Sequence, residues 1–428
     1  MDEKTDKKLV VPETIKDAEA LMNNYELLNG FYPSLGAQSD DDFYLLYDYW
    51  NSIDIVGKNN YVWEKENYNL YDWQYLYQMV LNTNIALETL EKVPQTSDNL
   101  EEWKQVKGEA LFFRAYAFYQ LAQYFAIPYD KSTADQNQGI PLRLTSDVNI
   151  KTVRAGLQQT YDQIIKDYKE ASQLLPVISQ HVSLPSRTAA YAALSRTFLT
   201  MGSYSLAENF ADSSLRLYNT LIDYNTLDSN SQTPFTMFNQ EVIFPSRNLG
   251  SGMLTISNWN VDSVLYQSYG PNDLRKSLFY ESNGPNTLGF KGNYDGTSDG
   301  NFFNGIAVDE VYLIRAESKA RLGDMEGAMN DLNTLLVTRW KNGTYIPYVA
   351  ATANDALLII LNERRKELVL RGLRWFDLRR LNKDAATAKT LTRILNGLAY
   401  KLPPNDPRYT FYIPPQVIET TGITQNKR

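Results

Sequence analysis

Two stretches of this chain repeat one another: 191-YAALSRTFLTMGSYSLAENFADSSL-215 and 312-YLIRAESKARLGDMEGAMNDLNTLL-336. They share a first tyrosine, a central glycine, an alanine five positions after that glycine and a last leucine, all at a constant offset of 121 residues (312 − 191). In each copy one helical pattern ends at the glycine and a second begins directly after it. Glycine permits the turn and alanine lets the two helices touch, as in a tetratricopeptide repeat. The pattern therefore predicts a mainly α fold.

Apolar residues recur at helical spacing in several further runs of the chain. Pro94 separates two such runs, Pro128 ends the second of them, and Pro176 closes a third. A last helical pattern covers 354–370 and breaks at Gly372. The predicted helical units, separated by insertions rather than arranged in tandem, lie at about 66–125, 157–219 and 309–339.

Two insertions between these units differ from them in composition. Residues 29–65 include the acidic run Asp40-Asp41-Asp42, and residues 223–306 are long and rich in Asn, Ser and Gly. Loops of this length are usually functional or disordered, and the many aromatic residues of the second insertion argue against disorder. The chain has 30 tyrosines and seven tryptophans, whose flat faces and polar tips suit sugar rings and protein interfaces. We expect the insertions to form the binding surface and most other aromatics to pack between helices.

Composition excludes several kinds of chemistry. The 428 residues include no cysteine and one histidine, His181, which excludes a thiol nucleophile, a cysteine-rich zinc site and a disulfide framework. The 42 basic and 50 acidic side chains give a net charge of −8, which disfavours nucleic-acid binding. No phosphate loop, dinucleotide-binding glycine pattern or nucleophile elbow is present, and nothing selects a carboxylate pair for glycoside hydrolysis. We therefore expect no enzyme, and a glycosidase is the weakest alternative.

Two polar motifs have structural explanations. Charges of both signs alternate between Glu363 and Arg380, and their helical spacing favours intramolecular ion pairs over a phosphate-binding patch. Residues 295–300, DGTSDG, resemble the first half of a calcium loop, but position 12 is Ile306 where a bidentate glutamate belongs. An ordinary Asp-rich turn is favoured there. We expect no cofactor, with calcium as the alternative.

Blocks of sequence from 114-RAYAFYQL-121 through 363-ERRKEL-368 to 425-QN-426 follow one another across nearly the whole chain, and together they resemble the SusD/RagB family. The most diagnostic block is 363-ERRKEL-368 with 374-RWFDLRR-380. The family's N-terminal lipoprotein cysteine has no counterpart here, and the chain is shorter than many members, so we expect trimmed binding loops. The other blocks are 114-RAYAFYQL-121 with 124-YFAIPY-129, 139-GIPL-142, 241-EVIF-244, Tyr269 with 272-NDLR-275, 310-EVYLIRAE-317, and 412-YIPPQ-416 with 425-QN-426.

The resemblance implies one SusD-like domain over 1–428: a helical tetratricopeptide-like scaffold with little β structure and ligand-binding loop insertions at 29–65 and 223–306. It implies a non-catalytic outer-membrane lipoprotein that binds an oligo- or polysaccharide at the cell surface and delivers it to a TonB-dependent SusC-like transporter. The polar start Met1–Lys8 has no apolar signal core, and no stretch is long enough to span a bilayer. The expected form is therefore cytoplasmic or, as the resemblance implies, a mature domain without its signal and lipidated cysteine.

Two other functions stay open alongside glycan binding. A peptide-binding member of the same family would use the same loops, but its pocket would satisfy backbone amides rather than hydroxyls. A tetratricopeptide interaction scaffold would bind a protein in its concave helical groove and would not need aromatic insertions.

The predicted glycan platforms are aromatic residues of the insertions. Each ring is expected to stack on a sugar face while nearby polar groups bind the hydroxyls. Trp259 is the first choice, because asparagines flank it and no apolar periodicity surrounds it. We expect Trp259→Ala to abolish binding without lowering the melting temperature. The other predicted platforms are Tyr61, Trp63, Tyr266 and Tyr294.

Overall fold

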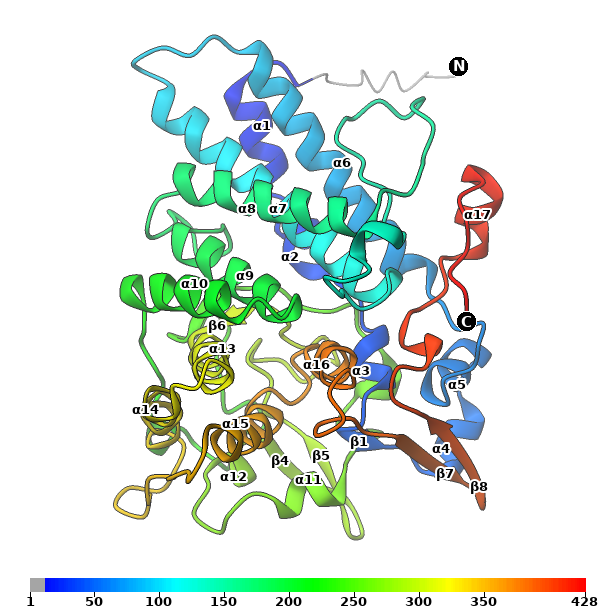
Figure 1. The fold of residues 1–428 in the computed structure, drawn as a ribbon, viewed down its shortest axis with the longest axis vertical. Helices are drawn as coiled ribbons and strands as arrows, with labels where there is room; N and C mark the ends of the chain where they lie inside the picture. Colours follow the sequence, from blue (N-terminus) through cyan, green and yellow to red (C-terminus); the bar gives the residue numbers. More distant parts are fainter. Residues whose placement is uncertain (1–11) are drawn as a thin grey trace, which may run out of the picture.

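The computed structural model describes residues 12–428, and helices dominate it (Figure 1). Consecutive helices pack side by side from α6 through α7, α8, α9 and α10 to α13, which also contacts α14 and α15, while α1 packs on α6. The scaffold helices are α1 (Ile15–Met22), α6 (Leu70–Lys92), α7 (Leu100–Phe125), α8 (Leu157–Leu174), α9 (Arg187–Thr200), α10 (Tyr204–Leu217), α13 (Val308–Arg321), α14 (Met325–Leu336) and α15 (Ala353–Glu367).

The repeated turns have the geometry that the sequence predicts. Gly202 between α9 and α10 has φ +73°, and Gly323 between α13 and α14 has φ +90°. Both values lie in the left-handed region that side chains avoid. Ala207 and Ala328, five positions after these glycines, are fully buried. The two helical hairpins predicted from the 121-residue repeat are therefore present.

The two insertions fold together into a layer of short elements beside the scaffold (Figure 1). Strand β1 belongs to the first insertion and β3 to the second, and they pair antiparallel with Phe43 opposite Val261 and Tyr44 opposite Asn260. The strands form four two-stranded antiparallel sheets: β1 (Phe43–Tyr44) with β3 (Asn260–Val261), β2 (Val242–Phe244) with β6 (Ile306–Ala307), β4 (Tyr280–Gly284) with β5 (Thr287–Phe290), and β7 (Leu391–Leu395) with β8 (Leu398–Leu402).

Short helices complete the chain between these strands and after the scaffold. They are α2 (Tyr25–Gly30), α3 (Leu35–Ser39), α4 (Tyr47–Ser52), α5 (Ile55–Tyr61), α11 (Ser263–Gln267), α12 (Arg275–Phe279), α16 (Arg374–Leu381) and α17 (Pro415–Thr421). The 3-10 turns are at Ala134–Gln136, Tyr224–Thr226, Gly252–Leu254 and Pro407–Tyr409. None of the helices within 12–428 is long and apolar enough to cross a membrane.

Residues 12–428 form two hydrophobic cores rather than one. The larger core lies between the scaffold helices and includes most of α7, where a run of buried aromatic and small residues lets neighbouring helices approach closely. The second core, which we call the loop core, fills the interior of the insertions and is rich in aromatic side chains such as Phe43, Trp259 and Tyr294. The insertions are therefore a packed layer with an interior of their own.

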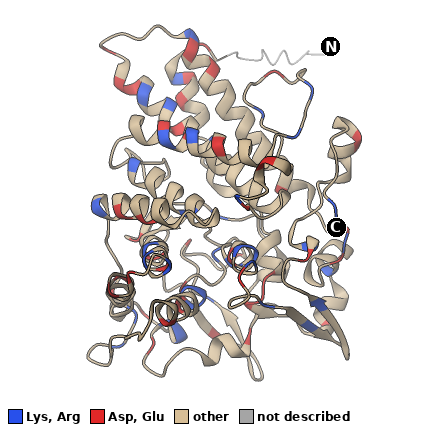
Figure 2. Cartoon of the chain, in the orientation of Figure 1, with Lys and Arg blue, Asp and Glu red and all other residues tan. Residues whose placement is uncertain are grey.

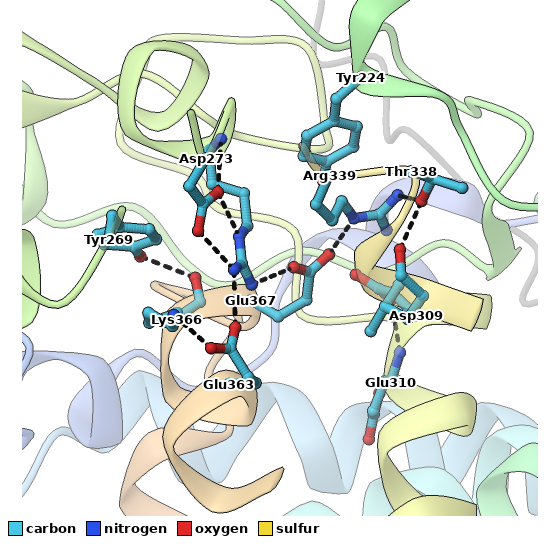
Figure 3. A network of polar contacts seen from close by, with 12 residues as sticks. Tyr224, Tyr269, Asp273, Asp309, Glu310, Thr338, Arg339, Glu363, Lys366 and Glu367 are labelled. Atoms are coloured by element: carbon cyan, nitrogen blue, oxygen red, sulfur yellow. Dashed lines mark hydrogen bonds and ion pairs between the residues drawn. The ribbon is translucent and has the colours of Figure 1, made fainter. Parts of the chain in front are cut away.

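A network of buried charges joins the loop layer to α15 (Figure 3). Glu367 accepts hydrogen bonds from Arg275 Nη1 at 2.9 Å and from Arg339 Nε at 2.6 Å, and Arg339 also pairs with Glu241 at 2.8 Å. Glu363 pairs with Arg275 Nη2 at 2.7 Å. Burial alone would raise the pKa of Glu367, but the two arginines hold it below its ordinary value.

Intramolecular ion pairs therefore explain the charged C-terminal block, as the sequence predicts. Arg364 pairs with Asp377 at 2.8 Å, and Arg374 reaches Asp41 in the first insertion at 2.6 Å. Arg380 forms ion pairs with Glu317 and Asp377. Charges of both signs lie close together on α13, α14, α15 and α16 (Figure 2).

Candidate functional site

A hollow of about 370 Å³ opens on the loop layer between α11 and the β4–β5 hairpin. We call it the α11 hollow. Two tyrosines, Tyr44 and Tyr266, line it together with polar side chains. The polar lining consists of the side chains of Ser263, Gln267, Ser282, Asn286 and Thr287, and none of the lining residues is charged.

Local sequence signals hold the walls of the α11 hollow in place. The Asp262 carboxylate caps α11 by accepting the Leu265 N–H at 2.9 Å, which fixes the helix that carries Tyr266. Tyr44 is held by the pairing of β1 with β3. Asn286 lies in the turn between β4 and β5 with φ +60°, a conformation that asparagine tolerates better than most residues. Each wall is therefore anchored to the loop core, while its polar side chains line the hollow.

The Tyr266 ring is oriented by two neighbours. It packs edge-on against Tyr280, with ring centroids 5.6 Å apart and an interplanar angle of 82°. Lys276 Nζ lies over the Tyr266 ring, 4.7 Å from its centroid. These contacts fix the ring without covering it, since Tyr266 stays half-buried and lines the hollow.

A second aromatic feature lies on α4 and β8. Tyr47, Trp50 and Tyr400 form a row, with successive ring centroids 6.0 and 6.3 Å apart. Tyr47 is 38% exposed, and Trp50 and Tyr400 are half-buried. Several aliphatic side chains on or next to α4, α5, β7 and β8 are also exposed: Leu46, Ile55, Val56, Ile394 and Leu398.

The aromatic row and the α11 hollow are neighbours along the chain. Tyr44 of the hollow precedes Tyr47 of the row by three residues, so their Cα atoms are at most about 11 Å apart. In Figure 1, α4 lies beside the β7–β8 hairpin, and β1 directly precedes α4 in the chain. The two features together offer several half-exposed rings beside uncharged polar groups.

Trp259, the first predicted platform, is a core residue, and that prediction is wrong. Its side chain has no exposed surface. Its ring stacks on Phe43 at 5.8 Å and on Tyr280 at 6.3 Å, so both faces meet protein. The flanking polar residues misled the prediction: Asn260 is itself a buried strand residue of β3.

Tyr61 and Trp63 are also buried, each 1% exposed, and they surround a cation instead of a ligand. The Arg393 guanidinium lies 3.5 Å from the Tyr61 ring centroid and 4.7 Å from that of Trp63. Trp63 has φ +58°, and its Nε1 donates to the Ser39 carbonyl at 2.8 Å. The rings are therefore unavailable as sugar platforms.

Tyr294 is the fourth predicted platform that the structure contradicts. It is 2% exposed, and its hydroxyl donates to Glu241 at 3.0 Å. The Arg371 guanidinium covers its ring at 4.3 Å. Of the five predicted residues, Tyr266 alone lines a hollow.

Sequence reasoning did not select Tyr44, Tyr47 or Trp50, although it marked 29–65 as a binding insertion. A usable signal is 47-YDYW-50, in which Tyr47 and Trp50 are three positions apart on a short helix that has no buried residue. That spacing places both rings on one face. Aromatics on an otherwise polar helix were the better indicator of exposure.

The turn at 295–300 is closed by contacts within the protein. Asp295 pairs with Arg247 at 3.0 Å, and the Thr297 hydroxyl donates to Asp299 at 2.9 Å. Within residues 12–428, no group of three or more His, Asp or Glu side chains is placed to hold a metal ion.

Comparison with known proteins gives consistent relatives. Residues 1–199 match a family described as starch-binding associating with outer membrane, and residues 308–416 match the SusD family. SusD-like protein P38 of Formosa agariphila is 22% identical, with 76% of this chain and 75% of the relative covered. SusD-like protein P2 of the same organism is 24% identical, with 72% of this chain and 71% of the relative covered.

Solved structures share the fold along almost the whole chain. A SusD superfamily protein from Bacteroides thetaiotaomicron superposes with a TM-score of 0.78 at 22% identity, covering 97% of this chain and 100% of that one. A SusD-like carbohydrate binding protein from Bacteroides vulgatus gives 0.73 at 20% identity, covering 96% and 97%. A laminarin binding SusD-like protein gives 0.70 at 18% identity, covering 96% and 98%.

A scaffold of helical hairpins that carries a packed loop layer is thus the architecture of a SusD-like protein, as the sequence predicts. The chain belongs to the SusD/RagB family.

Proposed function

We propose that this protein is a non-catalytic surface receptor that binds a neutral glycan at the α11 hollow and delivers it to a TonB-dependent SusC-like transporter. One observation carries the proposal: two tyrosines and a set of uncharged hydroxyl and amide groups share one hollow, with no charged side chain in its lining. Such groups satisfy sugar hydroxyls, which would otherwise lose hydrogen bonds to water.

The expected affinity is modest. An aromatic platform contributes about 1 kcal/mol beyond the area that it buries. Two or three platforms with their polar partners correspond to binding of roughly 4 to 8 kcal/mol, or millimolar to micromolar dissociation constants. Binding of this strength suits capture followed by release, and the aromatic row next to the hollow offers a longer chain further contacts.

The relatives support a glycan ligand and a surface location. The names of two structural neighbours specify carbohydrate and laminarin binding, and the family matched by 1–199 is described as starch-binding and associated with the outer membrane. Membership in the SusD/RagB family supports, as part of the proposal, attachment through an N-terminal lipid and transfer to a SusC-like partner. They are the finer parts of the proposal.

Calorimetric titration tests the ligand class directly. The panel contains neutral α- and β-glucan oligosaccharides, oligosaccharides rich in uronic acid, and mixed peptides. We expect saturable binding of a neutral oligosaccharide, weakened about tenfold or more by Tyr266→Ala. Tyr71→Ala, which removes an exposed tyrosine from α6, is the matched control and should bind as the parent does.

Chain length gives the same experiment a second readout. Trp50→Ala should weaken binding of long oligosaccharides while leaving that of disaccharides unchanged, because only a long chain reaches from the hollow to the aromatic row. Binding of peptides alone, or binding of a glycan that Tyr266→Ala leaves intact, would overturn the proposal.

A further inference from the structure

Arg379 on α16 is a buried cation that lacks a carboxylate partner. Its side chain is 3% exposed, and Nη2 donates to the Ala126 carbonyl. The other two nitrogens, Nε and Nη1, have no hydrogen-bond acceptor among residues 12–428. No ion pair within 4.0 Å joins Arg379 to any carboxylate in this part of the chain.

Other buried arginines of this protein are compensated in one of two ways. Arg380, the next residue, pairs with Glu317 and Asp377. Arg393 also lacks a carboxylate, but it donates to three backbone carbonyls and lies over aromatic rings. Arg379 has neither arrangement. A buried charge without compensation is strongly unfavourable, so we expect an anion to bind next to Arg379.

The electrostatics around Arg379 agree with this reading. Burial lowers the pKa of Arg379 to about 10, and three tyrosines, Tyr161, Tyr119 and Tyr124, oppose that shift only in part. Burial also lowers the pKa of Lys383, an effect that the nearby Asp130 opposes and the nearby Arg379 adds to. Two cations thus lie close together, each less favourably charged than it would be in water.

Arg379 and Lys383 line a hollow of about 390 Å³, which we call the α16 hollow. Lys427 also lines it. Of the two carboxylates at its wall, Asp406 pairs with Arg408, which lies outside the lining, at 2.9 Å, while Asp130 accepts from Ser132 and acts on Lys383. The lining thus has three cations against two carboxylates, one of which is already paired. The hollow is of a size that admits a small molecule. Its available charge is therefore positive.

We propose that the α16 hollow binds a small oxyanion, whose negative charge is shared by Arg379 and Lys383. A carboxylate or a tetrahedral phosphate or sulfate provides the same chemistry, because each offers two or more oxygens to a guanidinium. The walls come from four separate segments: α16 with the residues directly after it, the stretch after α7, the 405–410 segment, and the C-terminal Lys427. A bound oxyanion joins these segments, so it stabilises the folded chain as well as neutralising Arg379.

Thermal unfolding of the full chain tests the proposal, with phosphate, sulfate, acetate or glucuronate added at constant ionic strength against chloride. The expected result is a saturable rise in Tm of about 3 °C or more with at least one oxyanion. The tetrahedral and carboxylate arms identify the kind of group that is bound. Because sulfate and phosphate stabilise proteins generally, the decisive measurement is the difference between the parent and Arg379→Met.

Arg379→Met should fold, since it removes an uncompensated charge, and should lose the saturable rise. Lys383→Gln at the wall should raise the apparent dissociation constant about tenfold while keeping the fold. Lys107→Gln is the matched control: it removes one charge from α7, at a position about 27 Å along the helix from the end that leads to Ala126. Equal stabilisation of the parent and Arg379→Met, or no saturable effect of any oxyanion, would overturn the proposal.

Discussion

At the scale of single residues, the aromatic side chains of the loop layer divide by burial rather than by position in the sequence. Trp259 lies between Phe43 and Tyr280 and so connects the two insertions. Tyr266, seven residues further on, is half-buried and lines the α11 hollow. Trp259 follows Asn258 in an irregular stretch, whereas Tyr266 follows Leu265 on α11, so the polar neighbours of an aromatic residue do not indicate its exposure. The difference arises from pairing of β3 with a strand more than 200 residues earlier, which periodicity cannot reveal.

Replacing Trp259 with alanine should therefore destabilise the fold, contrary to the expectation from sequence. Removing a fully buried tryptophan leaves a cavity and costs about 3 to 5 kcal/mol of unfolding free energy. Denaturant unfolding followed by circular dichroism measures this cost. Tyr71→Ala, at an exposed position, should change the unfolding free energy by less than about 0.5 kcal/mol. An unchanged midpoint for Trp259→Ala would show that this ring does not pack as described.

At the scale of elements, the helical hairpins were predictable because their signals are local. A glycine turn and a small residue five positions later occur in both copies. The structure has the turn at each glycine and a buried alanine five positions later, as the sequence predicts. The end of α8 was similarly visible from Pro176, whereas α15 ends at Glu367, before the predicted end at residue 370 and the break at Gly372. Strands β1, β2, β3 and β6 were not predictable, because two- and three-residue strands carry no usable periodicity.

Gly323→Ala tests the conformational cost of the left-handed φ at the turn between α13 and α14. A Cβ at this position would have no atom within 4 Å, so the cost comes from the left-handed φ alone and should be about 1 kcal/mol. Gly30→Ala is the matched control, since its Cβ also has open space and its φ is not positive. We expect Gly323→Ala to lower the unfolding free energy and Gly30→Ala to leave it equal or higher. Equal effects of the two substitutions would contradict the conformational explanation.

At the scale of the whole molecule, the scaffold and the loop layer have separate interiors that share charged contacts. The buried network around Glu367 and the pairing of Arg374 with Asp41 attach one to the other. Two buried scaffold carboxyls are different, because no arginine or lysine lowers their pKa against the effect of burial. Burial raises the pKa of Asp72 and of Glu109 to about 7. Their titration should therefore set how stability varies with pH.

The direction of this dependence follows from linkage. A carboxyl whose pKa is higher in the folded state stabilises the fold while it is protonated. This stabilisation is complete below the unfolded-state pKa of about 4 and is lost as the pH rises through the folded-state pKa of about 7. Asp72 alone should account for a loss of about 2 kcal/mol between pH 5 and pH 8. Urea unfolding at both pH values should show a smaller loss in Asp72→Asn, whereas the surface variant Asp98→Asn should follow the parent. A loss of equal size in all three would contradict the assignment.

The division of the loop layer into a packed interior and a polar rim has a consequence for the glycan binding that we propose. The interior of the layer is held by Trp259, Tyr294 and their neighbours, whereas Gln267, Asn286 and Thr287 at the α11 hollow lie outside its packed interior. Under that proposal, substitutions at the rim alter ligand preference with little cost to the free energy of unfolding. The same scaffold could then bind different glycans after changes to a few side chains at the ends of short strands and helices.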